Sequence, residues 1–107
     1  GGGATNAGTA FKRLGFSTSV FCNIGNDSHG QQIIDNLLQE GISTDFITRS
    51  SQPTGQSFIL NTPTGNRTVF VHRGANKELD LSILTKEAIY KSNYLYITSL
   101  FYAALVQ

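Results

Sequence analysis

The chain has 107 residues, enough for a single hydrophobic core. Its formal net charge is +1 and 14% of its residues are charged, so composition gives no electrostatic basis for binding nucleic acid or a membrane surface. No apolar run is long enough to span a bilayer, and the single cysteine, Cys22, excludes an internal disulfide. We therefore expect a cytoplasmic protein with no nucleic-acid or membrane partner.

A helix is predicted at the start of the chain. Apolar residues recur at helical spacing over residues 4–14, with Lys12 and Arg13 on the other side. Gly15 follows, in the position where a glycine commonly ends a helix. The next run, residues 17–25, is short and apolar and predicts a buried strand.

A second helix and a return to the sheet are predicted next. Asp27 or Ser28 can cap this helix, which carries apolar residues on one face and ends at Gly41. Residues 42–49 then predict a strand or an extended segment. The order of helix, strand, helix and strand is typical of an α/β sheet.

The pattern changes at Pro53. Two runs with strong β character, residues 54–61 and 67–73, flank the segment TPTGN, whose proline and glycine predict a hairpin turn. The chain is therefore expected to carry a β flap inserted in its α/β sheet.

A helix and a strand are predicted after a loop at residues 74–76. Residues 79–92 predict a helix capped near Asp80 or Ser82. Residues 93–100 predict an apolar strand of the buried parallel type. Because the sequence stays apolar to its last residues, we expect it to be a piece of a longer protein.

The opening stretch, GGGATNAG, precedes the first helix directly. Glycines in this position expose backbone N–H groups to electron-rich ligand atoms at the positive helix end. Two phosphate-binding patterns nearly match. The Walker A pattern has Thr9 where a lysine is needed, and the dinucleotide pattern of Gly1 and Gly3 has Asn6 where a third glycine is needed. A Rossmann-type nucleotide binder is therefore the weaker alternative for this loop.

Asn6 allows two interpretations. Its amide both donates and accepts hydrogen bonds, which suits the hydroxyl groups of a polyol. An asparagine near a helix start can equally serve as a cap for the backbone. The residue types alone leave both interpretations open.

The stretch GGGATNAGTAFKRLGFSTSVFCNIGNDSHG resembles the first signature region of the PfkB, or ribokinase-like, carbohydrate kinases. The positions that match that pattern are Gly1, Gly2, Ala4, Asn6, Gly15 and Gly25. Later segments agree at fitting separations: GNDSHG, QEGIST, PTGQSFIL, GNRTVFVHRGAN and LYITSL. The resemblance covers essentially the whole chain. One departure is Gly8, where the family usually places Ser, Thr or Ala, and we expect it only to weaken the start of the helix slightly.

The resemblance implies a fold, and it implies which parts of the kinase domain lie within this chain. It implies a three-layer α/β/α ribokinase-like sheet with an inserted β-hairpin lid, of which residues 1–107 form the N-terminal acceptor-binding part. The first strand and the C-terminal half, with the catalytic aspartate and the ATP site, are then expected outside this chain. No catalytic residue is therefore expected within it.

The resemblance also implies an activity for the complete protein. It is expected to be an ATP-dependent kinase that phosphorylates a hydroxyl or hydroxymethyl group of a sugar or nucleoside, with Mg²⁺ as a second cofactor. A non-catalytic sugar-binding or regulatory domain on the same scaffold is the alternative. The resemblance further allows a homodimer formed through the hairpin.

The resemblance assigns sugar binding to the glycine loop and to the residue that follows it in the pattern: Gly1, Gly2, Gly3 and Asn6. Arg73 can pair with a carboxylate of an acidic substrate, or simply be a surface residue at a strand end. Gln56 and Phe58 share one face of the first hairpin strand, so both point to the ligand or both point away.

No metal site is predicted. His29 and His72 lie far apart in the sequence, and neither has a carboxylate or cysteine at the spacing of metal ligands. Cys22 lies within an apolar strand and is expected to be a small core residue.

Overall fold

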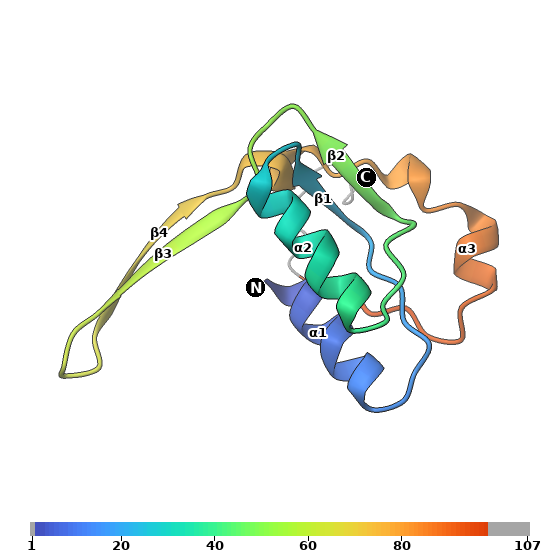
Figure 1. Cartoon of the computed structure of the whole chain (residues 1–107), viewed down its shortest axis with the longest axis horizontal. Helices are drawn as coiled ribbons and strands as arrows, with labels where there is room; N and C mark the ends of the chain where they lie inside the picture. The colour runs from blue at the N-terminus through green and yellow to red at the C-terminus, as the bar shows by residue number, and fades with distance from the viewer. Residues whose placement is uncertain (1, 99–107) are drawn as a thin grey trace.

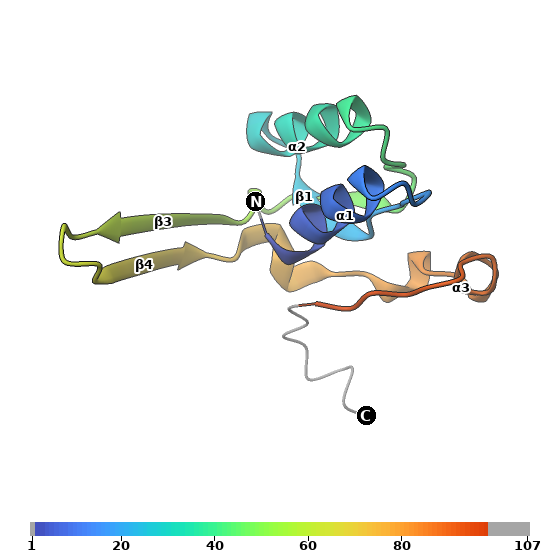
Figure 2. The ribbon, with the colours of Figure 1, turned by 90° about the horizontal axis from the view of Figure 1, so that it is seen from below.

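The computed structural model describes residues 2–98. Its first part contains α1 (Gly3–Arg13), β1 (Cys22–Gly25), α2 (Ser28–Gln39) and β2 (Ile47–Ser50). The two strands pair in parallel, from Cys22 opposite Ile47 to Gly25 opposite Ser50. In Figure 2, α2 lies on one side of this pair, and the segment after the hairpin lies on the other. The α/β character expected from the sequence is confirmed.

Glycines end both long helices where the sequence predicts. Gly15 has a φ of 97°, and the N–H of the next residue, Phe16, donates to the carbonyl of Phe11. Gly41 has a φ of 75° after α2. A residue with a side chain is strained at such angles, so glycine fixes both helix ends. The guanidinium of Arg13 in α1 forms an ion pair with Glu40, the C-cap residue of α2, and this joins the two helix ends.

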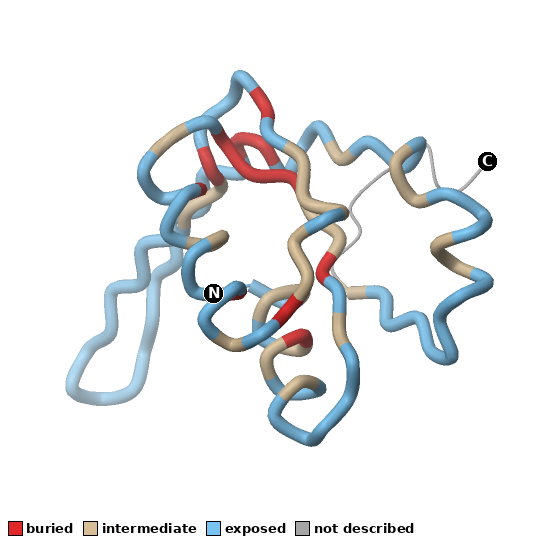
Figure 3. The backbone as a smooth tube through the Cα atoms, turned by 45° about the vertical axis from the view of Figure 1, so that its right-hand side comes forward, coloured by how far each residue is buried: buried red, intermediate tan, exposed pale blue. Residues whose placement is uncertain are grey.

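The core lies between the helices and the parallel pair. Its buried residues are Val20, Leu37 and Ile42, and it is completed by the half-buried Ala4, Cys22, Ile33 and Ile47. Figure 3 shows the buried positions within the body of the molecule, whereas the hairpin beyond Gln56 is exposed along its length. Cys22 packs in this core, as expected from its place in an apolar strand.

Gly8 is the buried residue of α1, and it has a larger packing role than the sequence suggested. A Cβ atom there would lie 2.6 Å from Cγ2 of Val20, whose side chain is buried. The glycine therefore lets α1 approach the core more closely than any residue with a side chain would.

The predicted hairpin is confirmed. β3 (Gln56–Asn61) and β4 (Arg67–His72) are antiparallel, and Phe58 lies opposite Phe70. The N–H of Thr62 donates to the carbonyl of Asn66 across the turn. The hairpin projects from the rest of the chain (Figure 1), and beyond Gln56 its strand residues are exposed.

The segment after β4 is a short 3-10 helix rather than an open loop. This element, η1 (Gly74–Glu78), buries Gly74 and Ala75 against the parallel pair. Gly74 has a φ of 48°, and a Cβ there would lie 2.0 Å from the carbonyl oxygen of Pro53, so the two ends of the hairpin meet at a glycine.

The helix predicted over residues 79–92 is wrong in extent. Two short elements replace it, η2 (Leu81–Ile83) and α3 (Lys86–Tyr90). The side chain of Asp80 accepts from the N–H of Ser82, and that of Thr85 accepts from the N–H of Ala88. Each cap begins its own turn, because a short polar side chain that bonds the following backbone competes with a continuous helix.

The strand predicted over residues 93–100 is not found in its described part. Residues 93–98 have no strand assignment, and residues 99–100 lie outside the described residues. A strand requires backbone pairing, and neither two-stranded sheet of the described chain includes this segment. The apolar side chains of Tyr94, Leu95 and Ile97 are consequently exposed.

The close contact at Gly8 gives a test of this packing. Replacing Gly8 by alanine adds overpacking strain of about 1–3 kcal/mol, against a gain in helix propensity of about 1 kcal/mol. We expect a net loss of up to about 2 kcal/mol in the free energy of unfolding, measured by denaturant titration. In a Val20→Ala background, where Cγ2 is absent, the same change should be neutral or stabilising. An equal loss in both backgrounds would contradict the contact.

Candidate functional site

The N-terminus of α1 presents backbone donors. Gly2 is the N-cap residue, with a φ of 103° and no side-chain cap. The N–H of Asn6 makes the first helical bond, to the carbonyl of Gly2 at 3.0 Å. The N–H groups of residues 3–5 come before it and have no acceptor within the helix. A ligand atom with a lone pair can therefore be bound at this end.

The three glycines differ in their structural roles. Gly2 needs glycine for its positive φ. Gly3 needs it for space, because a Cβ there would lie 2.7 Å from Oγ1 and Cγ2 of Thr98. Gly1 lies outside the described residues.

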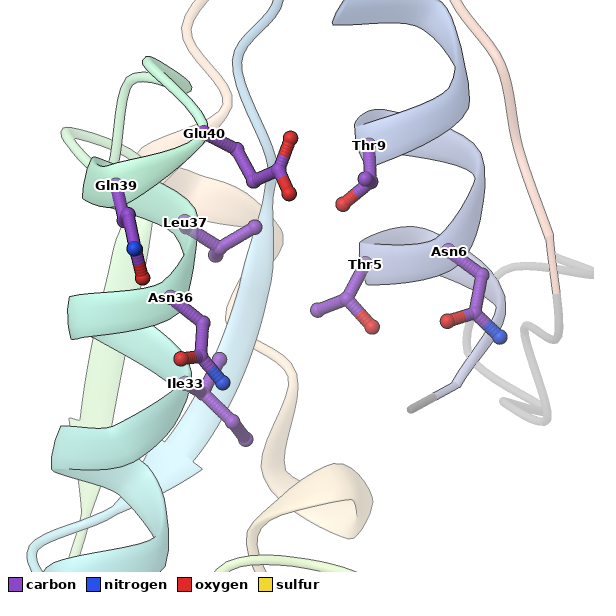
Figure 4. A pocket seen from close by; sticks show the side chains of 8 residues that line it. All are labelled: Thr5, Asn6, Thr9, Ile33, Asn36, Leu37, Gln39 and Glu40. Atoms are coloured by element: carbon purple, nitrogen blue, oxygen red, sulfur yellow. The ribbon is translucent and has the colours of Figure 1, made fainter. Parts of the chain in front are cut away.

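Asn6 is not the cap of α1. It lies inside the helix, four positions after Gly2, so its own N–H is bonded like that of any helical residue. Its side chain is exposed, and within residues 2–98 no hydrogen bond to the amide group is described. In Figure 4 the amide turns toward the N-terminal end of the helix. The capping interpretation is therefore wrong, and the amide is available to a ligand.

A groove of about 250 Å³ separates α1 from α2 beside Asn6. It is lined by Thr5, Asn6, Thr9, Ile33, Asn36, Leu37, Gln39 and Glu40. Figure 4 shows Thr5 and Thr9 on the side of α1 that faces α2. The lining is mainly uncharged and polar, and the carboxylate of Glu40 is already paired with Arg13.

The predicted hairpin residues lie at and beyond its base. Gln56 begins β3, and its Nε2 lies 3.1 Å from Nδ1 of His29. Phe58 is 63% exposed and shares a face with Gln56. Arg73 follows β4 and is also exposed. In both ribbon views the start of α1 and the base of the hairpin lie on the same side of the molecule (Figures 1 and 2). Gln56 is brought to His29 rather than to Asn6.

Asp27 has a second role that the sequence analysis missed. As the predicted N-cap of α2, its Oδ1 accepts from the N–H of Gly30 at 2.8 Å. The same carboxylate also accepts from Oγ1 of Thr54 at 2.6 Å and from the N–H of Thr54 at 2.8 Å. Thr54 is buried, and its hydroxyl oxygen accepts from the N–H of Gly25 at 2.9 Å. Helix-cap patterns reveal the local bond, whereas the partner 27 residues away has no signal in the sequence.

These hydrogen bonds control the charge of Asp27. The Thr54 hydroxyl, followed by the backbone N–H groups of Thr54 and Gly30, stabilises the ionised carboxylate and lowers its pKa to about 2. In contrast, burial raises the pKa of the Cys22 thiol to about 11, so this thiol stays protonated and unreactive at neutral pH.

A second polar network was also missed. Nδ2 of the buried Asn23 donates to the carbonyls of Ala75 and Glu78, each at 3.0 Å. Its Oδ1 accepts from Oγ1 of Thr48 at 3.1 Å. The hydroxyl of Ser50 donates to the carboxylate of Glu78. These bonds fasten η1, and with it the end of the hairpin, to both strands of the parallel pair.

Neither a metal cluster nor a membrane span occurs in the described part of the chain. Among residues 2–98 no three His, Cys, Asp or Glu side chains are grouped so that they could hold a metal ion. Over the same residues, no helix is both long enough and apolar enough to cross a bilayer.

Comparison with known proteins identifies the class to which this fold belongs. Fructokinase from Xylella fastidiosa superposes with a TM-score of 0.72 and 25% identity, over 81% of this chain and 28% of that one. Ribokinase from Arabidopsis thaliana, solved with ribose and ATP, superposes with a TM-score of 0.65 and 25% identity, over 71% of this chain and 25% of that one. The fold is thus that of the ribokinase-like kinases, and the chain represents part of it.

The sequence leads to the family. Residues 1–106 match the pfkB family of carbohydrate kinases, and the chain belongs to that family. An uncharacterized sugar kinase of Archaeoglobus fulgidus is 29% identical over 81% of this chain and 35% of its own length. Mouse ribokinase is 35% identical over 82% of this chain and 28% of its own length. The chain therefore spans about a third of these two relatives. The dinucleotide-binding alternative is left without support.

The lowered pKa of Asp27 predicts a change of stability in acid. A carboxylate whose pKa is depressed by folding contributes stability above its unfolded value, near 4, and this contribution is lost as the pH falls toward about 2. The free energy of unfolding should decrease over this window, and Asp27→Asn should flatten the decrease. Asp45→Asn removes an exposed carboxylate and controls for net charge. Parallel curves for wild type and Asp27→Asn would contradict the assigned bonds.

Proposed function

We propose that the complete protein transfers the γ-phosphoryl group of ATP to a hydroxyl group of a sugar or nucleoside, and that this chain supplies part of the acceptor site. The observation that carries the proposal is Asn6. In a chain of the pfkB family, its amide is exposed in the first turns of α1, beside the backbone N–H groups at the start of that helix. A side chain that both donates and accepts matches sugar hydroxyls, which do the same.

The chemistry of the site follows from its uncharged donors. The N–H groups at the start of α1 and the amide of Asn6 bind and orient hydroxyl groups without adding a formal charge. Gln56 and Phe58 then cover the acceptor from the hairpin and exclude water. Arg73, at the end of β4, pairs with a carboxylate where the substrate carries one.

ATP and Mg²⁺ are assigned to parts of the protein outside this chain. The described residues offer no group of three metal ligands, and Thr9 stands where a phosphate-binding lysine would be needed. These residues do not fit either group by themselves, so no step of phosphoryl transfer is assigned to them. The proposed role of the chain is to position the acceptor.

Replacing Asn6 by alanine in the complete protein tests the proposal. The variant leaves acceptor hydroxyls unpaired, which costs about 1–3 kcal/mol of binding, or roughly fivefold to 150-fold in the KM for the sugar. The KM for ATP should change little. Steady-state kinetics with ribose, fructose and a nucleoside, each titrated against fixed ATP, measures both constants.

Asn36→Ala is the matched control, because Asn36 is an exposed asparagine on the α2 side of the same groove. It should leave both KM values unchanged. If Asn6→Ala behaves like Asn36→Ala, Asn6 does not bind the acceptor. If the wild-type protein binds a sugar but transfers no phosphoryl group to it from ATP, the non-catalytic sugar-binding alternative is correct.

We further propose that the complete protein is a homodimer joined through the hairpin. One face of the hairpin presents Phe58, Leu60 and Phe70, and the opposite face presents Ile59, Val69 and Val71. All six side chains are exposed by 43% to 63%. A two-stranded hairpin is marginally stable alone, and one ligand can cover only one of its faces. A second hairpin covers the other.

The dimer is tested by placing a charge on the second face. Ile59→Asp should convert a dimer to a monomer in sedimentation velocity, because a buried carboxylate without a partner is costly. Thr64→Asp, in the turn, is the control and should leave the dimer intact. A wild-type monomer, or a dimer unaffected by Ile59→Asp, would rule out this interface.

A further inference from the structure

We propose that the β1–α2 turn, taken here as residues 25–30 from the end of β1 into the first turn of α2, clamps the base of the hairpin, and that Asp27 and His29 act as positioning residues for the acceptor. Asp27 holds Thr54, just before β3, and His29 holds Gln56, the first residue of β3. The second part of the proposal rests on the proposed function, because it concerns how the hairpin covers a sugar. The existence of the clamp does not depend on the proposed function.

The contacts of Asp27 in the clamp are short and partly buried. The Asp27 carboxylate receives three hydrogen bonds, two of them from Thr54, whose side chain is 4% exposed. The hydroxyl of Thr54 is in turn held by the N–H of Gly25. Both carboxylate oxygens of Asp27 and the hydroxyl of Thr54 therefore have partners, and a carboxylate with three donors holds them more strongly than a neutral group would.

The space around the clamp admits no side chain at either glycine of the turn. A Cβ on Gly25 would lie 2.4 Å from the N atom of Thr54, and a Cβ on Gly30 would lie 2.3 Å from the carbonyl oxygen of Gly25. The turn therefore packs closely against residues 52–54, which precede β3. This close fit is what lets the turn fix the direction in which β3 leaves.

His29 extends the clamp to the first residue of the strand. Its Nδ1 lies 3.1 Å from the Nε2 of Gln56. Because an amide nitrogen can only donate, this contact is a hydrogen bond in the tautomer whose Nδ1 carries no proton. The contact holds the side chain of Gln56. Of the two β3 residues predicted to contact the acceptor, Gln56 is the one nearer the base of the hairpin.

The other strand is tied down independently. The N–H of Ala75 donates to the carbonyl of Pro53 at 2.8 Å, and Asn23 holds the carbonyl of Ala75. Ala75 has no exposed surface, whereas the arm beyond Gln56 is exposed on both faces. The hairpin is held at its base and makes few contacts with the rest of the described chain along its length. The contacts at its base therefore determine its direction, and with it the positions of Gln56 and Phe58.

Thr54→Val in the complete protein tests the clamp. Valine keeps the shape and removes the hydroxyl, so the bonds to Asp27 and Gly25 through Oγ1 are lost. We expect hairpin amides over residues 54–58 to exchange hydrogen about tenfold faster, and the KM for the sugar to rise about tenfold, with the KM for ATP within about twofold of wild type. Thr54→Ser keeps the hydroxyl and should restore both values.

Two further variants separate the parts of the clamp. Asp27→Asn keeps an oxygen to cap α2 but loses one acceptor for Thr54, and it should reproduce Thr54→Val even if that variant folds poorly. His29→Ala should raise the KM for the sugar while leaving amide exchange at Thr54 unchanged. Thr44→Val is the matched control, because Thr44 precedes β2 at the end of that strand away from the hairpin, and it should alter neither readout.

The outcomes are distinguishable. Unchanged exchange in both Thr54→Val and Asp27→Asn would overturn the clamp. Faster exchange with an unchanged KM for the sugar would show that the clamp only stabilises the fold, and would overturn the positioning role. If wild type shows no sugar-dependent turnover of ATP, the proposed function fails, and the exchange experiment still decides whether the clamp exists.

Discussion

The carboxylate of Asp27 joins the two parts of the described chain. It caps α2 through Gly30 and, through Thr54, holds the segment from which the hairpin leaves. The parallel pair and α2 lie on one side of this carboxylate and the projecting hairpin lies on the other, while Asn23 makes a second connection through η1. Thr54 is buried, and a buried polar group is stable only when it has partners, so this cluster favours one relative placement of the elements around it. Gln56 and Phe58, two of the candidate acceptor residues, belong to the hairpin held in this way.

The parts of the fold that could be predicted are those with local causes. Gly15 and Gly41 end helices because of their backbone freedom, Asp27 begins one because of its side chain, and TPTGN forms a turn because of its proline and glycine. The interrupted segment after residue 79 shows the limit of periodicity. Apolar spacing there favours one helix, while Asp80 and Thr85 each bond the backbone two or three residues on and divide it.

The candidate site was predictable only in part, for a physical reason. Asn6 and the glycines follow a sequence pattern, and their place at the start of α1 follows from the helix itself. The bonds from Asp27 to Thr54 and from Asn23 to Ala75 and Glu78 span 27 to 55 residues. Nothing in one sequence distinguishes these polar residues from ordinary caps and loop residues. The partner of Gln56, His29, was likewise visible only in three dimensions.

The absence of a side chain at Gly8 has a consequence for which residues related proteins can carry at this position. Because this position sets how near α1 lies to Val20, it also sets the depth at which the glycine loop and Asn6 sit relative to the sheet. A serine, threonine or alanine here requires a smaller neighbour in place of Val20, or a helix displaced outward together with its ligand-binding end. Substitutions at these two positions should therefore be coupled, and the pair acts as a spacer that sets the depth of the proposed acceptor site.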